Sequence, residues 1–491
     1  MNLLSQDALP LEPTLWADVE DLFDYARSNP RPSGVQRVAF AILGSLRSRL
    51  SGTDRLRFVR HAGRKAVPLL QEIPWSEVEE LFARLRDPPD GSPAMRGRSH
   101  PSVSLRHAPK LLAARHWLGR IAYRMPAELR DPLLRAWFLQ RDAARELVAP
   151  LRARRKQPPS APLRSQPKQG FGIREGDMFL VLGAPWVHAD FGSLLRALRE
   201  DHGMRIGLLL HDLIPAVRPE WCTRDLVKGF RAWLVATLPQ CDLLLSNSRF
   251  TAKEVEGWAL REGLRLSGAV HPIPIGTGFE IETEPAWLRP LGLPRAGSYV
   301  LFVSTLEVRK NHALLVRVWR ELLEEEQLGL RPRGSVPGLV FAGRVGWLVS
   351  DLIEQLESAS WLENRVRLLR DPSDAELRAL YEGCLFSVFP SWHEGWGLPV
   401  TEALGLGVPV LCSSAGALPE AGGTLARYFD PGDTRGCREA VAALLDDREA
   451  LAAWRAEIRA RFRPTPWSAT AKAILDAVPG VQANVPEETA G

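Results

Sequence analysis

The stretch SWHEGWGLPVTEALGLGVPVL, residues 391–411, joins three kinds of local structure within one short segment. The apolar run CLFSVFPS, which ends at Ser391, is typical of a strand buried on both faces of a parallel sheet. Pro399 fits the first turn of a helix, where a missing N–H group costs nothing, and Gly405 is typical of a helix end. Residues 392–398 are therefore predicted to form a loop at the carboxyl end of a strand.

Two glutamates, Glu394 and Glu402, stand eight residues apart across this loop and helix. Glu394 is predicted to lie in the loop and Glu402 in the first turn of the helix, both on the cleft side. Gly395 and Gly397 let backbone N–H groups come close to a ligand, and the helix N-terminus favours an anion. A ligand with both hydroxyl and phosphate groups suits this set. The alternative is a glutamate that only interacts favourably with the dipole of its helix.

Apolar runs alternate with helix-patterned segments on both sides of this stretch. MRIGLLL, CDLLLS, SYVLFV and GLVFAG are predicted strands, and each is followed by a helical pattern. We therefore predict an α/β fold with two doubly wound, Rossmann-like domains that face a cleft. The predicted parts are an N-terminal domain over 1–283, a C-terminal domain over 296–463, a terminal helix over 464–480 that returns to the N-terminal domain, and a flexible tail over 481–491.

The composition is that of an ordinary globular protein. The chain has 491 residues, of which 45% are hydrophobic and 25% are charged. No run approaches the roughly 18 apolar residues that a membrane span needs, and the N-terminal stretch lacks the pattern of a signal peptide. The five cysteines form no CxxC pair, so neither a disulfide framework nor a zinc site is expected. We expect a cytoplasmic protein.

One segment carries the positive charge of the chain. Residues 94–168 hold 17 Lys and Arg against 4 Asp and Glu, whereas the whole chain has a net charge of only +5. Proline-rich stretches flank this segment, which predicts a helical insertion over about 88–168. It is either a helical hairpin with a solvated basic face, or a surface for anionic lipid head groups at the inner face of a membrane. Nucleic-acid binding rests on this segment alone and is not expected, because no nucleic-acid motif accompanies it.

Several motifs together resemble a known family. FPSWHEGWGLPVTEALGLGVPVLCS resembles the E-x7-E region of retaining glycosyltransferases of the GT-B fold, family 4, and RPSGVQRV, HDLIP, SNSRFTAKEV, IPIGTGF, STLEVRKNH and FAGRVGW follow the order expected for that family. The resemblance covers about 13–50 and 177–475. It is closest in character to the mannosyl- and rhamnosyltransferase-like branch that builds bacterial polysaccharides such as exopolysaccharide and lipopolysaccharide.

The resemblance implies roles for residues of the C-terminal domain, which would bind the sugar nucleotide. Glu394 would bind hydroxyl groups of the donor sugar, and Glu402 would hold the ribose of the nucleotide. Lys310, with Arg309 near it, would neutralise the diphosphate leaving group. The backbone amides that would contact the sugar and the diphosphate are those of Gly395, Trp396, Gly397 and Leu398.

The resemblance also implies roles for the N-terminal, acceptor-side domain. His211 would approach the donor sugar or the acceptor, with Asp212 and Arg37 on the acceptor side, and Gly34 would approach the diphosphate. Read without the family, His211 and Asp212 are a turn with a capping aspartate, and Gly34 is a plain loop-to-helix connection.

The sequence departs from the family at Ser304 and Thr305, where many relatives have Gly-Arg, so one phosphate-binding arginine is missing. Arg344 is a candidate substitute. No aspartate pair suits a metal-bound diphosphate, so neither a metal nor any other cofactor is predicted.

The predicted function is transfer of a hexose, with GDP-mannose as the first donor candidate, to a saccharide or lipid-linked saccharide. The alternatives are a phosphorylase or epimerase of the same fold, and a non-catalytic sugar-nucleotide-binding scaffold.

Overall fold

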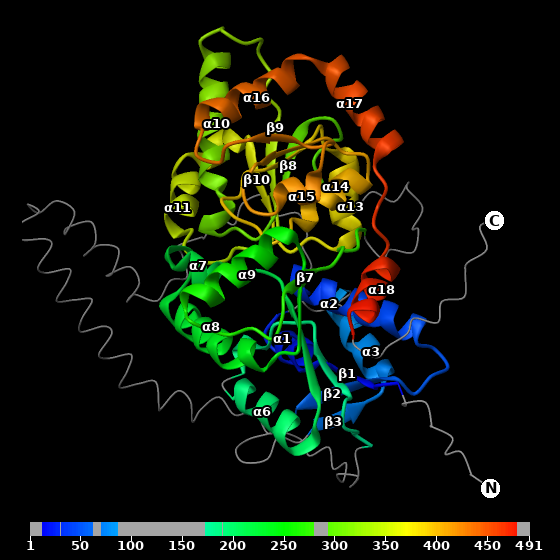
Figure 1. The fold of residues 1–491 in the computed structure, drawn as a ribbon. Coiled ribbons are helices and arrows are strands. Elements are labelled where there is room, and N and C mark those ends of the chain that lie inside the picture. Colours follow the sequence, from blue (N-terminus) through cyan, green and yellow to red (C-terminus); the bar gives the residue numbers. More distant parts are fainter. Residues whose placement is uncertain are drawn as a thin grey trace, which may run out of the picture. The chain divides into compact units, whose positions relative to one another are not determined.

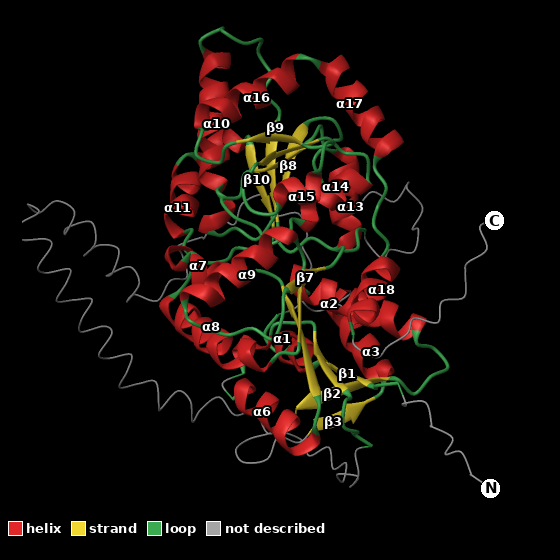
Figure 2. Cartoon of the chain, in the orientation of Figure 1, coloured by secondary structure: helices red, strands yellow, loops and turns green. Residues whose placement is uncertain are grey.

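The computed structural model describes residues 12–29, 31–61, 70–86, 172–188, 190–278 and 293–478. Within these ranges the strands form one sheet of seven and one sheet of six, shown in yellow in Figure 2 with helices beside them. The prediction of two doubly wound α/β domains is thereby confirmed. The predicted basic insertion and the predicted C-terminal tail lie outside the described residues.

The first sheet has the strand order β3-β2-β1-β4-β5-β6-β7. Its neighbours pair in parallel, except that β3 at one edge runs antiparallel to β2. The carboxyl ends of its parallel strands therefore lie at one edge, where ligands bind in open sheets of this kind. The strands are Leu15–Asp18 (β1), Leu56–His61 (β2), Leu70–Ile73 (β3), Met178–Val181 (β4), Arg205–Leu210 (β5), Leu243–Ser246 (β6) and Val270–Pro272 (β7).

Both faces of this sheet are covered. Along β1, Leu15 and Ala17 belong to one apolar core, whereas Trp16 belongs to another, because successive side chains point to opposite faces. This explains why the central strands read as continuous apolar runs. The helices of this domain are Glu20–Ala26 (α1), Gly34–Arg49 (α2), Trp75–Arg86 (α3), Phe191–His202 (α6), Ile214–Val217 (α7), Arg224–Thr237 (α8) and Arg249–Arg261 (α9), with 3₁₀ turns at Pro185–Val187 (η2), Pro219–Trp221 (η3) and Leu238–Gln240 (η4).

The second sheet has the strand order β10-β9-β8-β11-β12-β13 and is parallel throughout its described pairs. Its strands are Tyr299–Val303 (β8), Gly338–Ala342 (β9), Val366–Leu369 (β10), Ser387–Phe389 (β11), Val410–Ser413 (β12) and Arg427–Phe429 (β13). Its helices are His312–Gln327 (α10), Ser350–Ser358 (α11), Ser360–Asn364 (α12), Asp374–Gly383 (α13), Leu398–Gly405 (α14), Leu418–Gly422 (α15), Thr434–Asp446 (α16) and Arg448–Arg461 (α17), and a 3₁₀ turn spans Val308–Lys310 (η5).

The last described helix, Trp467–Ala477 (α18), packs on the first domain. Ala471, Ile474 and Leu475 join the apolar core that contains Val38 and Ile42 of α2. In Figure 1 this helix, in red, lies beside α2, in blue. The ring of Trp467 passes so close to Gly276 that a Cβ added there would meet it at 2.2 Å. The chain therefore crosses back after the second domain is complete.

Two parts of the first domain lie outside what the sequence patterns assign. Residues 56–86 add β2, β3 and α3, and α1 forms between β1 and the loop that precedes α2. Glu20 and Asp21 lie in the first turn of α1, where negative charge is favourable, and this seven-residue helix has no long apolar stripe. Among the described residues, no helix combines the length and the apolarity needed to cross a bilayer.

Candidate functional site

The loop between β11 and α14 has the predicted form, with two corrections at its ends. The strand ends at Phe389, two residues earlier than predicted, and α14 begins at Leu398 with Pro399 in its first turn. Gly397 has a φ of 115°, which a residue with a side chain rarely adopts, and it forms the N-terminal boundary of the helix. Glu402 is the fifth residue of α14 and not part of its first turn, because the helix already starts at Leu398, one residue before Pro399.

Gly395 brings this loop into direct contact with the first domain. A Cβ atom on Gly395 would lie 1.9 Å from the backbone oxygen of His211, so only glycine fits. The carbonyl of Gly395 accepts hydrogen bonds from the hydroxyls of Ser248, at 2.8 Å, and Thr251, at 3.2 Å. These two residues begin α9, whose N-terminal amides are also met by Glu420 of the second domain. The two domains are therefore in hydrogen-bonded contact around the loop.

Glu394 lies at the centre of a buried cluster of charges. Its Oε1 atom accepts from Lys310 Nζ at 2.5 Å, and its Oε2 atom accepts from Arg309 Nη1 at 2.8 Å. Glu307 pairs with the other side of Arg309, with 2.7 Å between Oε1 and Nε. Glu394 is 6% exposed and Lys310 is 9% exposed, so water screens these charges weakly. The structure thus places the two predicted diphosphate-binding cations on the predicted sugar-binding carboxylate.

The electrostatics of this cluster favour an ionised Glu394. Burial alone would raise its pKa, but Arg309 and Lys310 outweigh that effect and lower the pKa to about 2. The pKa of Lys310 is lowered by burial and by the neighbouring Arg309. Arg309 remains charged, since Glu394 and Glu307 raise its pKa despite burial. The site therefore holds fixed charges of both signs at neutral pH.

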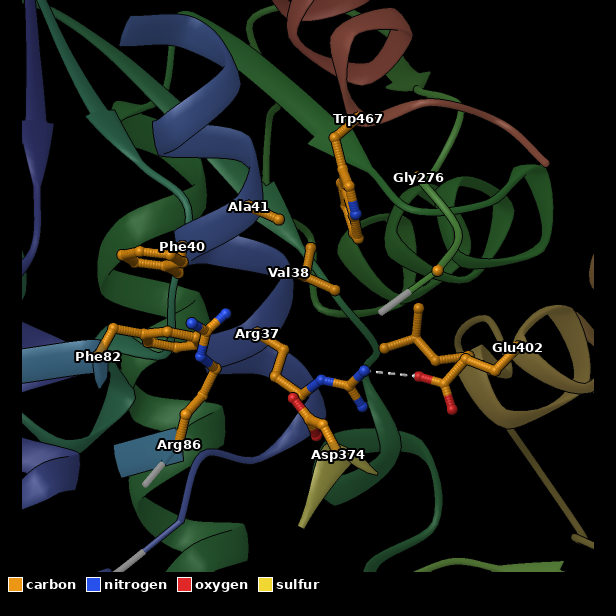
Figure 3. Close-up of a pocket in the computed structure, with 12 residues that line it drawn as sticks. Arg37, Val38, Phe40, Ala41, Phe82, Arg86, Gly276, Asp374, Glu402 and Trp467 are labelled. Atoms are coloured by element: carbon orange, nitrogen blue, oxygen red, sulfur yellow. Dashed lines mark ion pairs between the residues drawn. The ribbon is translucent and has the colours of Figure 1, made fainter. Parts of the chain in front are cut away.

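Glu402 meets a residue of the first domain. Arg37 of α2 approaches it with 3.0 Å between Nη2 and Oε1, and the side chain of Glu402 is 3% exposed. The other carboxylate oxygen accepts from the hydroxyl of Tyr381 at 3.3 Å. Figure 3 shows Arg37 and Glu402 beside a small cavity of about 30 Å³, with Asp374 below the guanidinium and Trp467 across from it. Arg37 was predicted on the acceptor side, whereas the structure brings it to the carboxylate predicted for the ribose.

His211 and Asp212 follow β5 at its carboxyl end, as predicted. His211 Nε2 lies 2.9 Å from the backbone oxygen of Leu182, which can only accept, so this ring nitrogen donates. Burial lowers the pKa of His211, which favours the neutral ring. Asp212 accepts from the backbone N–H of Ile214 at 3.0 Å, the capping contact of a turn.

The segment before α2 is held from the second domain. Arg344 donates from Nη1 to Asn29 Oδ1 at 2.9 Å and from Nη2 to the carbonyl of Arg31 at 3.1 Å. These contacts, together with the Arg37 pair, hold the start of α2, where Gly34 is the first helical residue. Ser304 is the first residue of the Ser304-Thr305 pair at which the sequence departs from the family. Its hydroxyl lies 3.1 Å from His312 Nε2.

Residues from the loops and helices described above line one cavity of about 800 Å³. That volume lies within the roughly 300–1,000 Å³ of typical small-molecule sites. Every predicted site residue lines it: Gly34, Arg37, His211, Asp212, Arg309, Lys310, Glu394, Gly395, Trp396, Gly397, Leu398 and Glu402.

Several residues of the site were not found from the sequence. Glu307 is buried and completes the charge cluster, yet it differs from a surface glutamate only by preceding the RKN motif. Asn247 donates to the carbonyl of His211 at 2.7 Å. His393 lies 3.1 Å from Glu254 of α9. The SNSRFT motif signalled the start of α9, but not its contact with Gly395.

Comparisons with known proteins concern the C-terminal domain and the fold. Residues 284–461 match the family described as "Glycosyl transferases group 1". The chain is 28% identical over 232 residues to the serotype-specific mannosyltransferase WbdA of Escherichia coli, a match that covers 45% of this chain and 27% of that protein. It is 29% identical over 246 residues to the O-antigen chain mannosyltransferase B of Escherichia coli, which covers 48% of this chain and 60% of the relative. The chain thus spans less than two thirds of either relative.

A solved structure shares the fold over nearly the whole chain. The crystal structure of Anabaena Alr3699/HepE in complex with UDP and glucose matches with a TM-score of 0.51 at 15% identity, and the match covers 94% of this chain and 98% of that one. At this identity the likeness concerns the fold alone. Residues 284–461 therefore match the glycosyl transferases group 1 family, and the described residues have a two-domain fold of the GT-B type.

Proposed function

We propose that this protein is a retaining glycosyltransferase that moves a hexose from a nucleoside-diphosphate sugar to a saccharide or lipid-linked saccharide in polysaccharide biosynthesis. The observation that carries the proposal is the convergence of Lys310, Arg309 and Glu394 inside a cavity lined by both domains. Mannose from GDP-mannose is the donor to test first, because the curated relatives named above are mannosyltransferases.

The charges of the site suit departure of a nucleoside diphosphate. Negative charge develops on the leaving oxygen, and Lys310 and Arg309 are held where they would stabilise it. The N-terminus of α14, beside Gly397, adds the positive end of a helix dipole, as does the N-terminus of α2 at Gly34. In this proposal these groups carry the leaving-group charge without a metal ion.

Glu394 has two successive partners in the proposed reaction. Without substrate it neutralises Lys310 and Arg309, which otherwise would be buried charges without a counter-ion. When the donor binds, the diphosphate takes over as counter-ion, and the ionised carboxylate accepts hydrogen bonds from hydroxyl groups of the sugar. Its low pKa keeps it an acceptor across the neutral range.

Retention requires the acceptor hydroxyl to approach from the face that the diphosphate leaves. The bond from the anomeric carbon to the phosphate oxygen breaks as the bond to the acceptor oxygen forms, and the acceptor proton passes to the departing phosphate oxygen. The contacts of Gly395 with Ser248, Thr251 and His211 hold the domains together around this point. Such closure excludes water and limits hydrolysis of the donor.

The test is nucleotide release from a panel of GDP-, UDP-, ADP- and dTDP-sugars, compared with Glu394→Ala and Lys310→Ala. Release from one donor that disappears in both variants supports the proposal and identifies the donor. NMR of the product's anomeric proton then shows whether configuration is retained. Activity that survives chelation of divalent cations supports the metal-free leaving group.

Binding of a nucleotide sugar with no turnover in the presence of any saccharide acceptor contradicts the proposal and favours a scaffold. A lipid-linked acceptor, with peripheral membrane contact through residues 94–168, is a separate part of the proposal. Flotation with anionic vesicles tests it, and failure of the protein to float overturns that part alone.

A further inference from the structure

Two tryptophans, one from each domain, meet beside the large cavity, and Trp347 is the one that lines it. Trp347 follows β9 and donates from Nε1 to the carbonyl of Trp221 at 2.9 Å. Trp221 ends the 3₁₀ turn η3 that follows β5 and α7 in the first domain. Trp347 lines the cavity and is 40% exposed, whereas a tryptophan that serves only the core is largely covered.

Exposed apolar residues stand close to Trp347 in the same loop. The loops after β8 and β9 pair through a bridge between Leu306 and Val345, which brings the two loops side by side. Val345 is 38% exposed and Leu348 is 53% exposed, and Leu348 has a φ of 57°, in the left-handed region. Apolar groups gathered at the mouth of a cavity are typical of a site that a ligand covers.

The two tryptophans lie near the sugar end of the proposed donor site. The ring of Trp221 is 6.3 Å from the ring of His393, which directly precedes Glu394. Burial and the nearby charges of Glu307 and Asp212 raise the pKa of the adjacent Cys222 thiol, whereas Arg309 lowers it. Glu402, at the ribose end, has Arg37 and Tyr381 as its partners instead.

We propose that Trp347 and Trp221 form an acceptor subsite that binds a pyranose ring of the saccharide onto which the hexose is transferred; this rests on the proposed function. One face of a pyranose presents C–H groups, which pack on an aromatic ring, while its hydroxyl groups point outward to polar partners. Arg218 covers one face of Trp221, with its guanidinium carbon 4.9 Å from the ring centre, so Trp347 offers the ring on which the sugar packs and Arg218 offers the polar partner beside it. Glu220, 3.7 Å from Arg218, adds an acceptor.

The probe is an α-linked mannotriose, added with GDP and followed by saturation-transfer NMR. Mannotriose is chosen as the acceptor probe because mannose is the proposed donor sugar, so a chain that grows by mannose transfer ends in mannose. The wild-type protein is expected to saturate the ring protons of mannotriose. Trp347→Ala should weaken mannotriose binding about tenfold, and Trp347→Phe should restore most of it, because an aromatic face remains. The affinity for GDP alone, measured by calorimetry, should stay unchanged in both variants.

Two further variants keep the test independent of misfolding. Arg218→Ala removes an exposed side chain beside Trp221, and we expect it to weaken mannotriose binding without affecting GDP. Leu260→Ala removes an apolar side chain on α9 that is 81% exposed and outside the cavity lining, and it should change neither affinity. Absence of mannotriose binding to the wild-type protein overturns the subsite. If Trp347→Ala weakens the binding of GDP and of mannotriose equally, the subsite is also overturned. Trp347 would then contact the nucleobase or support closure of the domains.

Failure of the subsite and failure of the proposed function give different results. A protein that turns over no nucleotide sugar, yet binds mannotriose through Trp347, retains the subsite and loses the function. A protein that releases nucleotide through Glu394, yet binds mannotriose equally well in Trp347→Ala, retains the function and loses the subsite.

Discussion

Arg37 and Glu402 form an ion pair that joins the two domains, with 3.0 Å between Nη2 and Oε1. Arg37 belongs to α2 of the first domain, and Glu402 belongs to α14 of the second. A carboxylate has about four acceptor positions, so Arg37 and Tyr381 leave capacity for a ribose diol on the same group. The orientation of Glu402 thus depends on a side chain from the opposite domain.

Replacing Arg37 by glutamine should therefore weaken nucleotide binding. Glu402 would lose its charged partner and keep the hydrogen bond from the hydroxyl of Tyr381. We expect the dissociation constant of the preferred nucleoside diphosphate to rise about tenfold, which corresponds to about 1.4 kcal/mol. Calorimetry on the apo protein measures this directly.

The matched control is Arg47→Gln on the same helix, whose side chain is 55% exposed, pairs with a surface glutamate at 3.6 Å and lies over the ring of Trp75. Combining Arg37→Gln with Glu402→Gln should cost less than the sum of the two single changes, because the residues act as a pair. If Arg37→Gln instead raises the KM of the acceptor and leaves the nucleotide affinity unchanged, Arg37 acts on the acceptor, as predicted from the sequence.

Glu394→Gln should separate nucleotide affinity from turnover. The change removes the counter-ion of Lys310 and Arg309, so both cations become available to the diphosphate. We expect the free nucleoside diphosphate to bind at least as tightly as to the wild-type protein, while the additional affinity due to the sugar is lost. Calorimetry with the nucleotide and with its sugar conjugate gives both values. If the affinities for the nucleotide and for its sugar conjugate fall by the same factor, Glu394 maintains the structure of the site and does not bind the sugar.

Gly395→Ala should disturb the contact between the domains. The new Cβ would meet the carbonyl oxygen of His211 at 1.9 Å. Because the positions of both atoms are fixed by the backbone, the clash can be relieved only if the loop or the strand end moves. We expect loss of nucleotide-dependent turnover together with a lower melting temperature. Gly229→Ala on the exposed face of α8 is the control, because a Cβ there meets nothing within 4 Å. That control should stabilise the protein by about 0.5–1 kcal/mol. Full activity of Gly395→Ala would show that this approach is not needed for catalysis.

Asp21 should make stability depend on pH. Burial and the nearby Asp18 raise the pKa of its carboxyl from 3.8 to about 7. Between these values the folded protein holds a proton that the unfolded chain has released, so the free energy of unfolding falls as pH rises. The expected slope is on the order of 1 kcal/mol per pH unit in that window.

Asp21→Asn removes this titration and keeps an acceptor for the backbone N–H of Ala184, which lies 3.0 Å from Asp21 Oδ2. The melting temperature of the variant should exceed that of the wild-type protein at pH 8, by more than it does at pH 5. A difference that is the same at both pH values contradicts the raised pKa.

Much of the architecture could be predicted from local sequence. The runs RIGLLL and YVLFV are continuous apolar stretches, and they form β5 and β8 because both faces of each sheet are covered. Pro399 marked the first turn of α14 because its backbone preference acts within a few residues. Residues 56–86 escaped prediction because β3 is a four-residue edge strand whose two exposed residues, Gln71 and Glu72, are adjacent and break the alternation of a strand pattern.

The site divides in the same way. The sequence by itself determined the loop that carries Glu394, the turn that carries Arg309 and Lys310, and the strand end that carries His211, since each follows a strand whose pattern is local. Only the tertiary structure decided which of these groups meet. Arg344 and Asn29 lie 315 positions apart, and no periodicity relates residues of two different sheets. Long side chains such as Arg37 take the partner that burial and charge leave open, and that choice exists only once both domains have folded and closed on one another.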